Sequence, residues 1–482
     1  MRPNKRNSLW NLVSLTLIFA MFIAILPMMA GNNRVFAATS PDSTVYLPLT
    51  MSDAPRQATI FGTQVQHLKS EDVGNLFQEA DLYWIRINAF DWDRIEPENT
   101  SPATYHWNAV NSSTLRNIAR NGASIIATIR FAPDWALKYK SHVCGPIKEQ
   151  AFTDFADFLK DLVKRYSVPP YNIKYWEIGN EPDVDPGAFS EPRPGYGCWG
   201  NANDDYYGGG YYAQMLAKAY PAIKSADPSA KVLIGGLLLD CDPTNPPAGR
   251  TDGCEPAKFF EGILRGGGAD YFDIVSFHGY PPYIGSLKWD EQNPGWASRG
   301  GVVLGKINFL REIMANYGVD KPLILTEGSL ICPEWSTEDC NPPTDAFYEA
   351  QADYVTWLYV RNWAEGLLGT IWYRFESPNW RYGSLLDDNQ NPKPAYNALN
   401  FITEELKSAS YTAQIQGYEG LQVYEFTTPS KKIWVMWAPD EQPHNIQLPE
   451  NVTGIYDKYG NILSAPGNLL SVKSPVYVEL AP

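Results

Sequence analysis

Two carboxylate side chains in this chain stand where a predicted strand opens into a loop. The first is Glu181, which Asn180 precedes in the stretch Tyr175–Asp183. The segment Ile173–Glu177 is rich in β-branched and aromatic residues, which favours a strand that breaks at Gly179. An amide beside a carboxyl at the end of a strand is typical of a catalytic acid. An exposed loop glutamate is the plainer alternative.

The second carboxylate, Glu327, closes the short apolar run Pro322–Gly328. Strand alternation would place Leu323, Leu325 and Glu327 on one face, so that Glu327 points along the interior of a barrel at its rim. Taken alone, this residue fits a structural role equally well. Its pairing with Glu181, at the expected place in the strand order, favours a functional site.

Strand-like and helix-like segments alternate along most of the chain after residue 57. Eight β units that are each followed by a helix predict an α/β fold, a (β/α)8 TIM barrel, over residues 58–407. A doubly wound open sheet is the rival, but it gives no reason for acids at the ends of the fourth and seventh strands. The predicted strands are Ile60–Gln66, Leu82–Ala89, Ser124–Arg130, Ile173–Gly179, Lys231–Leu239, Phe272–Gly279, Leu323–Gly328 and Gly369–Phe375.

Helical spacing of apolar residues is clearest over Phe152–Tyr166 and Ile307–Tyr317. From residue 411 the pattern changes to alternation, which predicts a small C-terminal antiparallel β-sandwich domain over residues 411–482. We expect this domain to be a structural module that packs on the barrel rather than a carbohydrate-binding domain. Its predicted strands are Leu421–Phe426, Ile433–Trp437, Ile455–Gly460 and Val476–Leu480.

The first 37 residues have the pattern of an export signal. Basic residues precede the apolar stretch Leu9–Ala30, and Val35-Phe36-Ala37 resembles a cleavage site before Ala38. An uncleaved membrane anchor remains an alternative, because the apolar stretch is longer than most signal cores. We expect a secreted protein, with residues 38–57 as a polar linker.

The six cysteines fit an oxidising compartment, and all lie in predicted loops. Cys241–Cys254 and Cys332–Cys340 would each bracket one loop, which leaves Cys144 to pair with Cys198. A metal site is the other use of cysteine. However, there is no CxxC pair and the five histidines do not cluster with the cysteines, so we expect no metal and no cofactor.

Composition bounds the class of partner. The chain has 482 residues, of which 44% are hydrophobic and 19% charged, enough for a barrel with a second domain. The formal net charge is −15, and it is more negative without the basic N-terminus. This charge argues against nucleic acid or an anionic membrane surface as partner, and a neutral polymer fits better.

The motif Asn180-Glu181-Pro182 resembles the acid/base motif of the clan A glycoside hydrolases, a set of retaining (β/α)8-barrel glycosidases. The resemblance covers roughly residues 58–407 and is closest in motif style to families 39, 5 and 51. It implies that Glu181 is the acid/base and that Glu327, on the seventh strand, is the nucleophile. Glu177 is a rival acid, which we expect to be buried and hydrogen-bonded.

Further site residues follow from the same resemblance, each also compatible with core packing. Trp135 is added as one of the loop aromatics whose flat faces suit a sugar ring. The expected roles are Arg86 paired with the nucleophile, Asn180 on the sugar 2-hydroxyl, His278 and Tyr280 bonded to the nucleophile and the sugar, and Trp372 as the aromatic floor of the first subsite.

The resemblance therefore implies a secreted retaining glycoside hydrolase. It would cleave β-type glycosidic bonds of plant-type or microbial polysaccharides or oligosaccharides by double displacement. Two alternatives stay open, a non-catalytic carbohydrate-binding surface protein on a barrel scaffold and a transglycosylase. The sugar, the linkage and endo or exo action are not separated by these motifs.

Overall fold

The computed structural model describes residues 57–482 except 67, 69–70, 141, 189–194 and 377–379. Within this part of the chain, eight strands form one sheet. All eight strands predicted from the sequence are confirmed, two of them with identical bounds. The strands are β1 Phe61–Gln64, β2 Trp84–Asp91, β3 Ser124–Arg130, β4 Tyr175–Asn180, β5 Lys231–Gly236, β6 Val275–Gly279, β7 Leu323–Gly328 and β8 Thr370–Trp372.

The sheet is parallel, with strand order β5-β4-β3-β2-β1-β8-β7-β6. β1 pairs with both β2 and β8, so the first and last strands of the barrel are neighbours. Between β5 and β6 there are only isolated parallel bridges, Leu233 to Ile274 and Leu237 to Phe277. Together with backbone hydrogen bonds such as Leu237 N to Ser276 O at 3.0 Å, these bridges form the β5–β6 seam that closes the sheet into the predicted (β/α)8 barrel.

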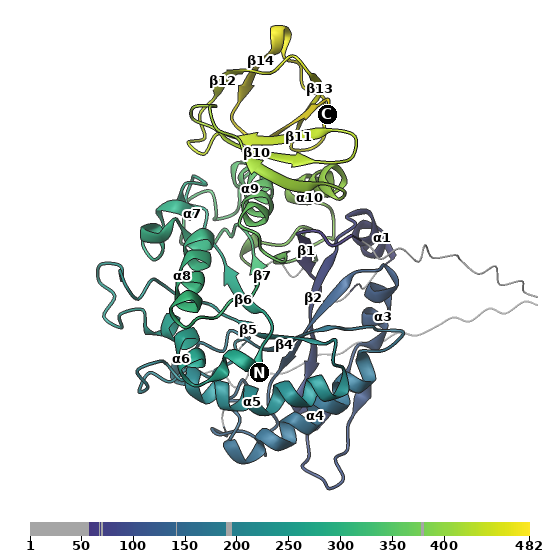
Figure 1. Cartoon of the computed structure of the whole chain (residues 1–482), viewed down its shortest axis with the longest axis vertical. Helices are drawn as coiled ribbons and strands as arrows, with labels where there is room; N and C mark the ends of the chain where they lie inside the picture. The colour runs from purple at the N-terminus through teal and green to yellow at the C-terminus, as the bar shows by residue number, and fades with distance from the viewer. Residues whose placement is uncertain (1–56, 67, 69–70, 141, 189–194, 377–379) are drawn as a thin grey trace, which may run out of the picture. The chain divides into compact units, whose positions relative to one another are not determined.

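Helices connect successive strands and lie outside them (Figure 1). The prediction of a helix over Phe152–Tyr166 is confirmed to the residue, whereas the helix before β7 begins earlier than expected. The helices are α1 Glu71–Glu79, α2 Trp92–Ile95, α3 Ser112–Arg120, α4 Phe152–Tyr166, α5 Gly209–Ala226, α6 Phe259–Arg265, α7 Trp289–Gln292, α8 Val302–Asn316, α9 Asp345–Ala364 and α10 Pro394–Leu406.

The barrel interior changes from apolar to polar along the strands. A buried apolar cluster fills its lower part, with one residue from each of six strands or their starts: Trp84, Ile126, Leu233, Ile274, Ile324 and Ile371. Two residues beyond Trp84, on the same face of β2, lies the buried Arg86. The apolar layer thus supports a charged layer at the carboxyl ends of the strands, where barrel active sites lie.

In β7 the prediction for Leu323 and Leu325 is wrong, whereas the prediction that Glu327 points to the barrel interior is right. Leu323 and Leu325 pack in the large core outside the strands, while Ile324 faces the barrel interior. The pairing with β6 then shifts, because Phe277 opposes Leu325 but His278 opposes Glu327. This irregularity inserts one extra residue, Thr326, and so re-aims Glu327 toward the interior.

A second sheet follows the barrel, as predicted. It has the strand order β13-β15-β11-β10-β9, with a separate β12–β14 pair. The hairpin predicted between Leu421–Phe426 and Ile433–Trp437 is confirmed as the β10–β11 pair. The bounds are β9 Ser410–Gln414, β10 Gln422–Thr427, β11 Lys432–Trp437, β12 His444–Gln447, β13 Val452–Asp457, β14 Leu469–Val472 and β15 Val476–Leu480.

Three disulfides join the pairs predicted from loop spacing, Cys144–Cys198, Cys241–Cys254 and Cys332–Cys340. The expected export signal over residues 1–37 and nearly all of the linker lie outside the described residues. No helix in the described part of the chain combines the length and apolarity that a membrane crossing needs.

Candidate active site

Glu181 lies directly after β4, at a sharp change in backbone direction. Gly179 has φ 90°, and Glu181 itself has φ 51°, a region that residues with a Cβ seldom adopt. The backbone is held there because the amide of Glu181 donates to the carbonyl of Gly236 at 2.9 Å. This turn directs a side chain that is only 6% exposed toward the mouth of the barrel.

Glu327 ends β7 on the opposite side of the same mouth. One of its oxygens accepts a hydrogen bond from a guanidinium nitrogen of Arg86, and the other accepts one from the hydroxyl of Tyr280. Burial alone would lower the pKa of Arg86, but the charges of Glu177 and Glu327 raise it above its ordinary value. Arg86 therefore stays charged and bonded to Glu327.

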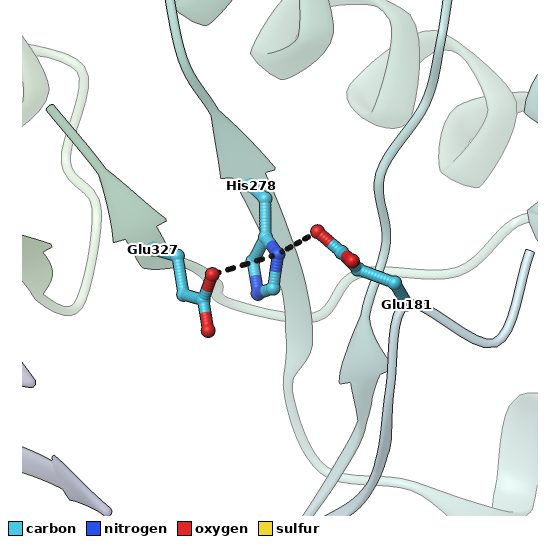
Figure 2. A group of neighbouring side chains, drawn as sticks. All are labelled: Glu181, His278 and Glu327. Atoms are coloured by element: carbon cyan, nitrogen blue, oxygen red, sulfur yellow. Dashed lines mark hydrogen bonds and ion pairs between the residues drawn. The ribbon is translucent and has the colours of Figure 1, made fainter. Parts of the chain in front are cut away.

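The two glutamates converge. Glu181, His278 and Glu327 each offer an oxygen or nitrogen, and these three atoms lie within 4.8 Å of one another. Figure 2 shows the imidazole of His278 between the two carboxyl groups. A separation of about 5 Å between two carboxyls is the spacing of a direct-displacement pair, with no room for a water between nucleophile and sugar.

His278 bonds mainly to Glu181, not to the nucleophile as expected. Its Nδ1 is 2.8 Å from Oε1 of Glu181 and 3.5 Å from Oε2 of Glu327. Burial lowers the pKa of His278 to about 4, so the ring is neutral. Nε2 is buried and has no hydrogen-bond partner among the described residues, and a Cβ at Gly236 would collide with it. This pattern assigns the proton to Nδ1, which donates to Glu181.

The environments of the two glutamates differ. Burial raises the pKa of Glu181 to about 7, against the opposing charges of Arg86 and Lys306. Glu181 is thus protonated in mildly acidic solution, while Glu327 is bonded directly to a guanidinium. Opposed environments of this kind separate an acid from a nucleophile of the same residue type.

Arg86 organises the remaining polar groups of the barrel interior. Its Nε donates to Glu177 at 2.7 Å and its Nη2 to Oδ1 of Asn180 at 2.6 Å. Glu177 also accepts from Thr128 at 2.9 Å and is fully buried, as predicted for a rival acid that takes a structural role. The Asn180 amide donates to Gly195 O at 3.1 Å, which fixes its orientation at the mouth.

Trp372 is not at the mouth, which corrects its predicted role as the floor of a sugar subsite. Ile371 faces the barrel interior, so alternation turns Trp372 outward. It is fully buried there, and its Nε1 donates to Gly383 O at 2.8 Å. The next residue, Tyr373, is the one that lines the cavity.

Trp135 is also away from the cavity. Its ring lies 5.2 Å from that of Trp92, at 78°, and its Nε1 donates to Glu96 O at 3.2 Å. Loop position alone does not distinguish a tryptophan that binds substrate from one that packs. The structure therefore brings together Arg86, Asn180, Glu181, His278, Tyr280 and Glu327, but neither Trp135 nor Trp372.

Both glutamates line a cavity of about 630 Å³. Among its lining residues, sequence reasoning missed Lys306 and Tyr373, whereas Trp380 is one of the loop aromatics expected to suit a sugar ring. Lys306 had a detectable signal, because it is a lone lysine on the apolar side of a helical pattern. Trp380 is 41% exposed, and its ring meets those of Tyr280 and Tyr373 edge-on at 5.2 and 5.7 Å.

The cluster Glu181, His278 and Glu327 has the composition of a potential cation site among the described residues. Arg86 already neutralises Glu327, and His278 presents a proton rather than a lone pair to Glu181. These contacts favour the carboxylates as reacting groups over a role as ligands. That the protein uses no metal and no cofactor stays a prediction.

No family model and no curated protein matches the sequence. Solved structures do match. A family 39 glycoside hydrolase from Bacteroides cellulosilyticus WH2 has 17% identity and a TM-score of 0.64, over 89% of this chain and 82% of that chain. A monomeric β-xylosidase from Caulobacter crescentus CB15 has 15% identity and a TM-score of 0.55, over 88% and 96%.

An α-L-arabinofuranosidase from Thermotoga maritima is also similar, with 13% identity and a TM-score of 0.51, over 89% of this chain and 97% of that chain. At such identities these likenesses establish the fold. It is the fold that the resemblance to clan A glycoside hydrolases predicted, an eight-stranded parallel barrel followed by an antiparallel sheet.

Proposed function

We propose that this protein is a retaining glycoside hydrolase in which Glu327 is the nucleophile and Glu181 the acid/base. The observation that carries the proposal is the convergence of the two side chains, one oxygen of Glu181 lying within 4.8 Å of one oxygen of Glu327 at one mouth of the barrel. Retaining glycosidases need two carboxyls about 5 to 5.5 Å apart, whereas inverting ones need about 6.5 to 9.5 Å. The fold shared with known glycosidases supports the same activity.

In the first step, an oxygen of Glu327 attacks the anomeric carbon of the sugar. The bond from that carbon to the glycosidic oxygen breaks, and its electron pair stays on the oxygen. Glu181 gives its proton to this oxygen, so the alcohol leaves neutral. The hydrogen bonds from Arg86 and Tyr280 orient the Glu327 carboxyl group before the attack.

In the second step the roles change. The Glu181 carboxylate takes a proton from water, whose oxygen attacks the anomeric carbon and breaks its bond to Glu327. The sugar leaves with its original configuration after two inversions. Tyr280 and Arg86 again bond to the departing carboxylate, since they contact different oxygens of Glu327.

His278 and Asn180 assist from fixed positions. The Nδ1 proton of His278 occupies Oε1 of Glu181, so the acid proton sits on the other oxygen, Oε2. Asn180, held by Arg86 and Gly195, can bond the sugar 2-hydroxyl, a contact that strengthens in the transition state.

The substrate class is proposed as β-linked polysaccharides or oligosaccharides of plant or microbial origin. Support comes from the similar solved proteins, among them a xylanase from Clostridium acetobutylicum and the β-xylosidase from C. crescentus. We also propose that the protein is secreted, since the three disulfides and the N-terminal sequence pattern both fit export.

Rescue of Glu327→Gly by azide tests the assignment. Azide fits the space left by the carboxylate and should give a glycosyl azide whose anomeric configuration is opposite to that of the substrate. Product NMR on a panel of aryl glycosides and polysaccharides reads both the sugar and the configuration. If a folded variant gives no azide product on a substrate that the wild type turns over, Glu327 is not the nucleophile.

The same panel separates the alternatives. A barrel that only binds carbohydrate would turn over none of the substrates, although it would still retain them. A transglycosylase would give longer oligosaccharides rather than free sugar. Glu327 is hydrogen-bonded to Arg86 and Glu181 to His278. These contacts favour hydrolysis or transfer over a purely binding role.

A further inference from the structure

Lys306 is a buried charge in the wall of the cavity that the mechanism above does not use. It lies on α8 between Gly305 and Ile307, is only 5% exposed, and lines the same cavity as both glutamates. A lysine in such a place is costly unless its ammonium group is bonded. A buried lysine at the mouth of the barrel therefore needs an explanation.

The ammonium group is bonded to main-chain carbonyls rather than to a carboxylate. Its Nζ donates to Leu238 O at 2.7 Å and to His278 O at 2.9 Å. No carboxylate oxygen of the described residues lies within salt-bridge distance of it. The positive charge of Lys306 is thus not neutralised by a direct ion pair, and it lies at the wall of the cavity.

These two carbonyls lie on opposite sides of the β5–β6 seam of the barrel. Leu238 follows β5 and His278 belongs to β6, and isolated bridges rather than a continuous ladder join these two strands. The amide of His278 also donates to Leu237 O at 2.8 Å. Lys306 therefore holds together the two chain segments that meet beside Glu181.

The acid glutamate is attached to the same seam. The amide of Glu181 donates to Gly236 O, and the carboxylate of Asp183 accepts from the amides of Leu238 and Leu239 at 2.9 and 2.8 Å. The segment that carries the acid thus fixes residues 236–239 through the carbonyl of Gly236 and the amides of Leu238 and Leu239. Lys306 fixes them through a carbonyl.

We propose that Lys306 is a positioning residue for the acid/base: through the carbonyl of His278 it fixes the imidazole that orients Glu181, and its charge favours the ionised form of Glu181 needed in the second step. This inference rests on the proposed function. It goes further in assigning a role to a residue outside the motifs that carry the resemblance.

The charge balance around Glu181 explains why a cation is useful there. The acid must be protonated in the first step and ionised in the second, and burial alone favours only the protonated form. The titratable and charged groups that face it are Arg86 on β2, Glu177 on β4, Asp183 after β4, His278 and Tyr280 on or after β6, Lys306 on α8, Glu327 on β7 and Tyr373 after β8.

Of the cations in that set, Arg86 is bonded to Glu177 and Glu327, whereas Lys306 has no carboxylate bonded to it. Burial lowers the pKa of Lys306 to about 8, while Asp183, Asp240, Glu181 and Asp290 oppose this shift. Lys306 is therefore mostly charged at the pH where half of Glu181 is protonated.

Lys306→Met tests the proposal, because it keeps the apolar stem and removes the charge and the hydrogen bonds. Without the cation, Glu181 holds its proton to higher pH. The fall of kcat/KM at high pH should move up by about one pH unit. With an aryl glycoside whose good leaving group makes the second step limiting, kcat near pH 6 should fall by about 10-fold or more, and KM should fall with it.

Lys393→Met is the matched control. Lys393 is another buried lysine, 6% exposed, whose Nζ donates to the carbonyl of Tyr382 at 2.9 Å, away from Glu181. It should leave the position of the high-pH fall unchanged. Lys306→Gln, which retains a donor but no charge, serves if the Met variant does not fold, and the same upward move of the fall is expected.

The outcomes are distinct from those that test the function. If wild-type protein turns over substrate and traps azide, but a folded Lys306 variant keeps the wild-type pH profile and kcat, the role of Lys306 is rejected. If the control Lys393→Met moves the profile equally, the effect comes from loss of any buried lysine rather than from the position of Lys306, and the proposal is again rejected. If wild-type protein has no glycosidase activity at all, it is the proposed function that fails.

Discussion

At the scale of single residues, the two glutamates of this site have the same chemistry in solution and different chemistry in the barrel. Glu327 shares a hydrogen bond with the buried guanidinium of Arg86. Glu181 is buried beside a neutral imidazole, and burial raises its pKa to about 7. Position alone therefore separates a group that attacks from a group that gives up a proton.

This difference predicts the pH dependence of the enzyme. A raised pKa keeps Glu181 protonated below about pH 7, so the first step should be fast in mild acid and decline as pH rises through that value. Glu181→Ala should abolish this decline. It should also cost natural substrates about 100-fold or more in kcat/KM, while sparing aryl glycosides whose leaving groups need no proton. Initial rates across pH for both substrate types check this.

The control is Asn180→Ala, which removes a group beside Glu181 that does not titrate. It should lower kcat/KM on both substrate types while the decline stays at its wild-type pH. Equal losses for Glu181→Ala on good and poor leaving groups would remove Glu181 from the role of acid.

Most of the site residues could be predicted because their signal is local. Asn180 and Glu181 are adjacent in sequence, and Arg86 stands on a clear strand pattern. The contact of His278 with the acid was not predictable, because it depends on which ring nitrogen meets which carboxyl across 97 residues of chain. Motifs at the ends of strands do not reveal Lys306, because it lies on α8 and reaches the strand ends only through the fold.

At the scale of elements, the strands could be predicted from the sequence. The side of the sheet to which each side chain points could be predicted only in part. Periodicity found all eight barrel strands, and it placed Glu327 correctly toward the interior, yet it assigned Leu323 and Leu325 to the wrong face of β7. One extra residue in the strand reverses the alternation of side chains. The sequence around Thr326 gives no sign of this irregularity. The same dependence on register turned Trp372 out of the barrel and brought Tyr373 to the cavity.

The turn Trp380–Gly383, after β8, is the element that presents an exposed aromatic ring to the cavity. Arg381 and Tyr382 have φ values of 47° and 59°, which cost roughly 1 to 3 kcal/mol each and persist only where neighbours hold them. Four donors hold this turn: Cys332 N to Arg381 O at 2.9 Å, Gln351 Nε2 and Lys393 Nζ to Tyr382 O at 3.0 and 2.9 Å, and Trp372 Nε1 to Gly383 O at 2.8 Å.

A turn so strongly held predicts a fixed contact with the substrate. Trp380→Ala should raise KM about 3- to 10-fold with little change in kcat, because a flat ring binds a sugar by its apolar face in ground and transition states alike. Steady-state kinetics on an oligosaccharide measures both constants.

Trp335→Ala is the matched control, since Trp335 is 70% exposed and does not line the cavity. It should leave KM unchanged. A Trp380 variant with wild-type KM on oligosaccharides and aryl glycosides alike would show that this ring does not touch substrate.

At the scale of the whole molecule, helix α9 joins the barrel to the C-terminal sheet. A helix on the surface of a barrel should expose one face, but in α9 every residue from Tyr354 to Asn362 is buried. The face away from the strands packs on the second sheet. Trp357 stacks with Trp437 at 5.7 Å, and Trp363 lies 5.1 Å from Phe426.

Helix α10 contributes to the same junction. Phe401 meets Tyr477 edge-on at 5.0 Å, and Glu405 accepts a bond from Lys431 at 2.7 Å. Residues Arg56–Pro482 form one compact unit rather than two, with no internal division at the predicted boundary near residue 407. The C-terminal sheet thus completes the core of the barrel.

Removal of this sheet by a stop after Lys407 should therefore expose the aromatic face of α9 and α10 to water. Because that face is a contiguous apolar surface, we expect aggregated protein rather than a smaller active enzyme. Centrifugation after expression and thermal unfolding of any soluble fraction measure this.

The control for the truncation breaks one polar contact of the same sheet and leaves its apolar face in place. Glu441, between β11 and β12, accepts a bond from the hydroxyl of Ser286 at 2.9 Å and another from the amide of Leu287. Glu441→Ala should remain soluble and folded, since it removes no aromatic packing. A truncated chain that is soluble and as active as the full protein would instead show that α9 is stable without its cover, and that the second sheet has a role other than support.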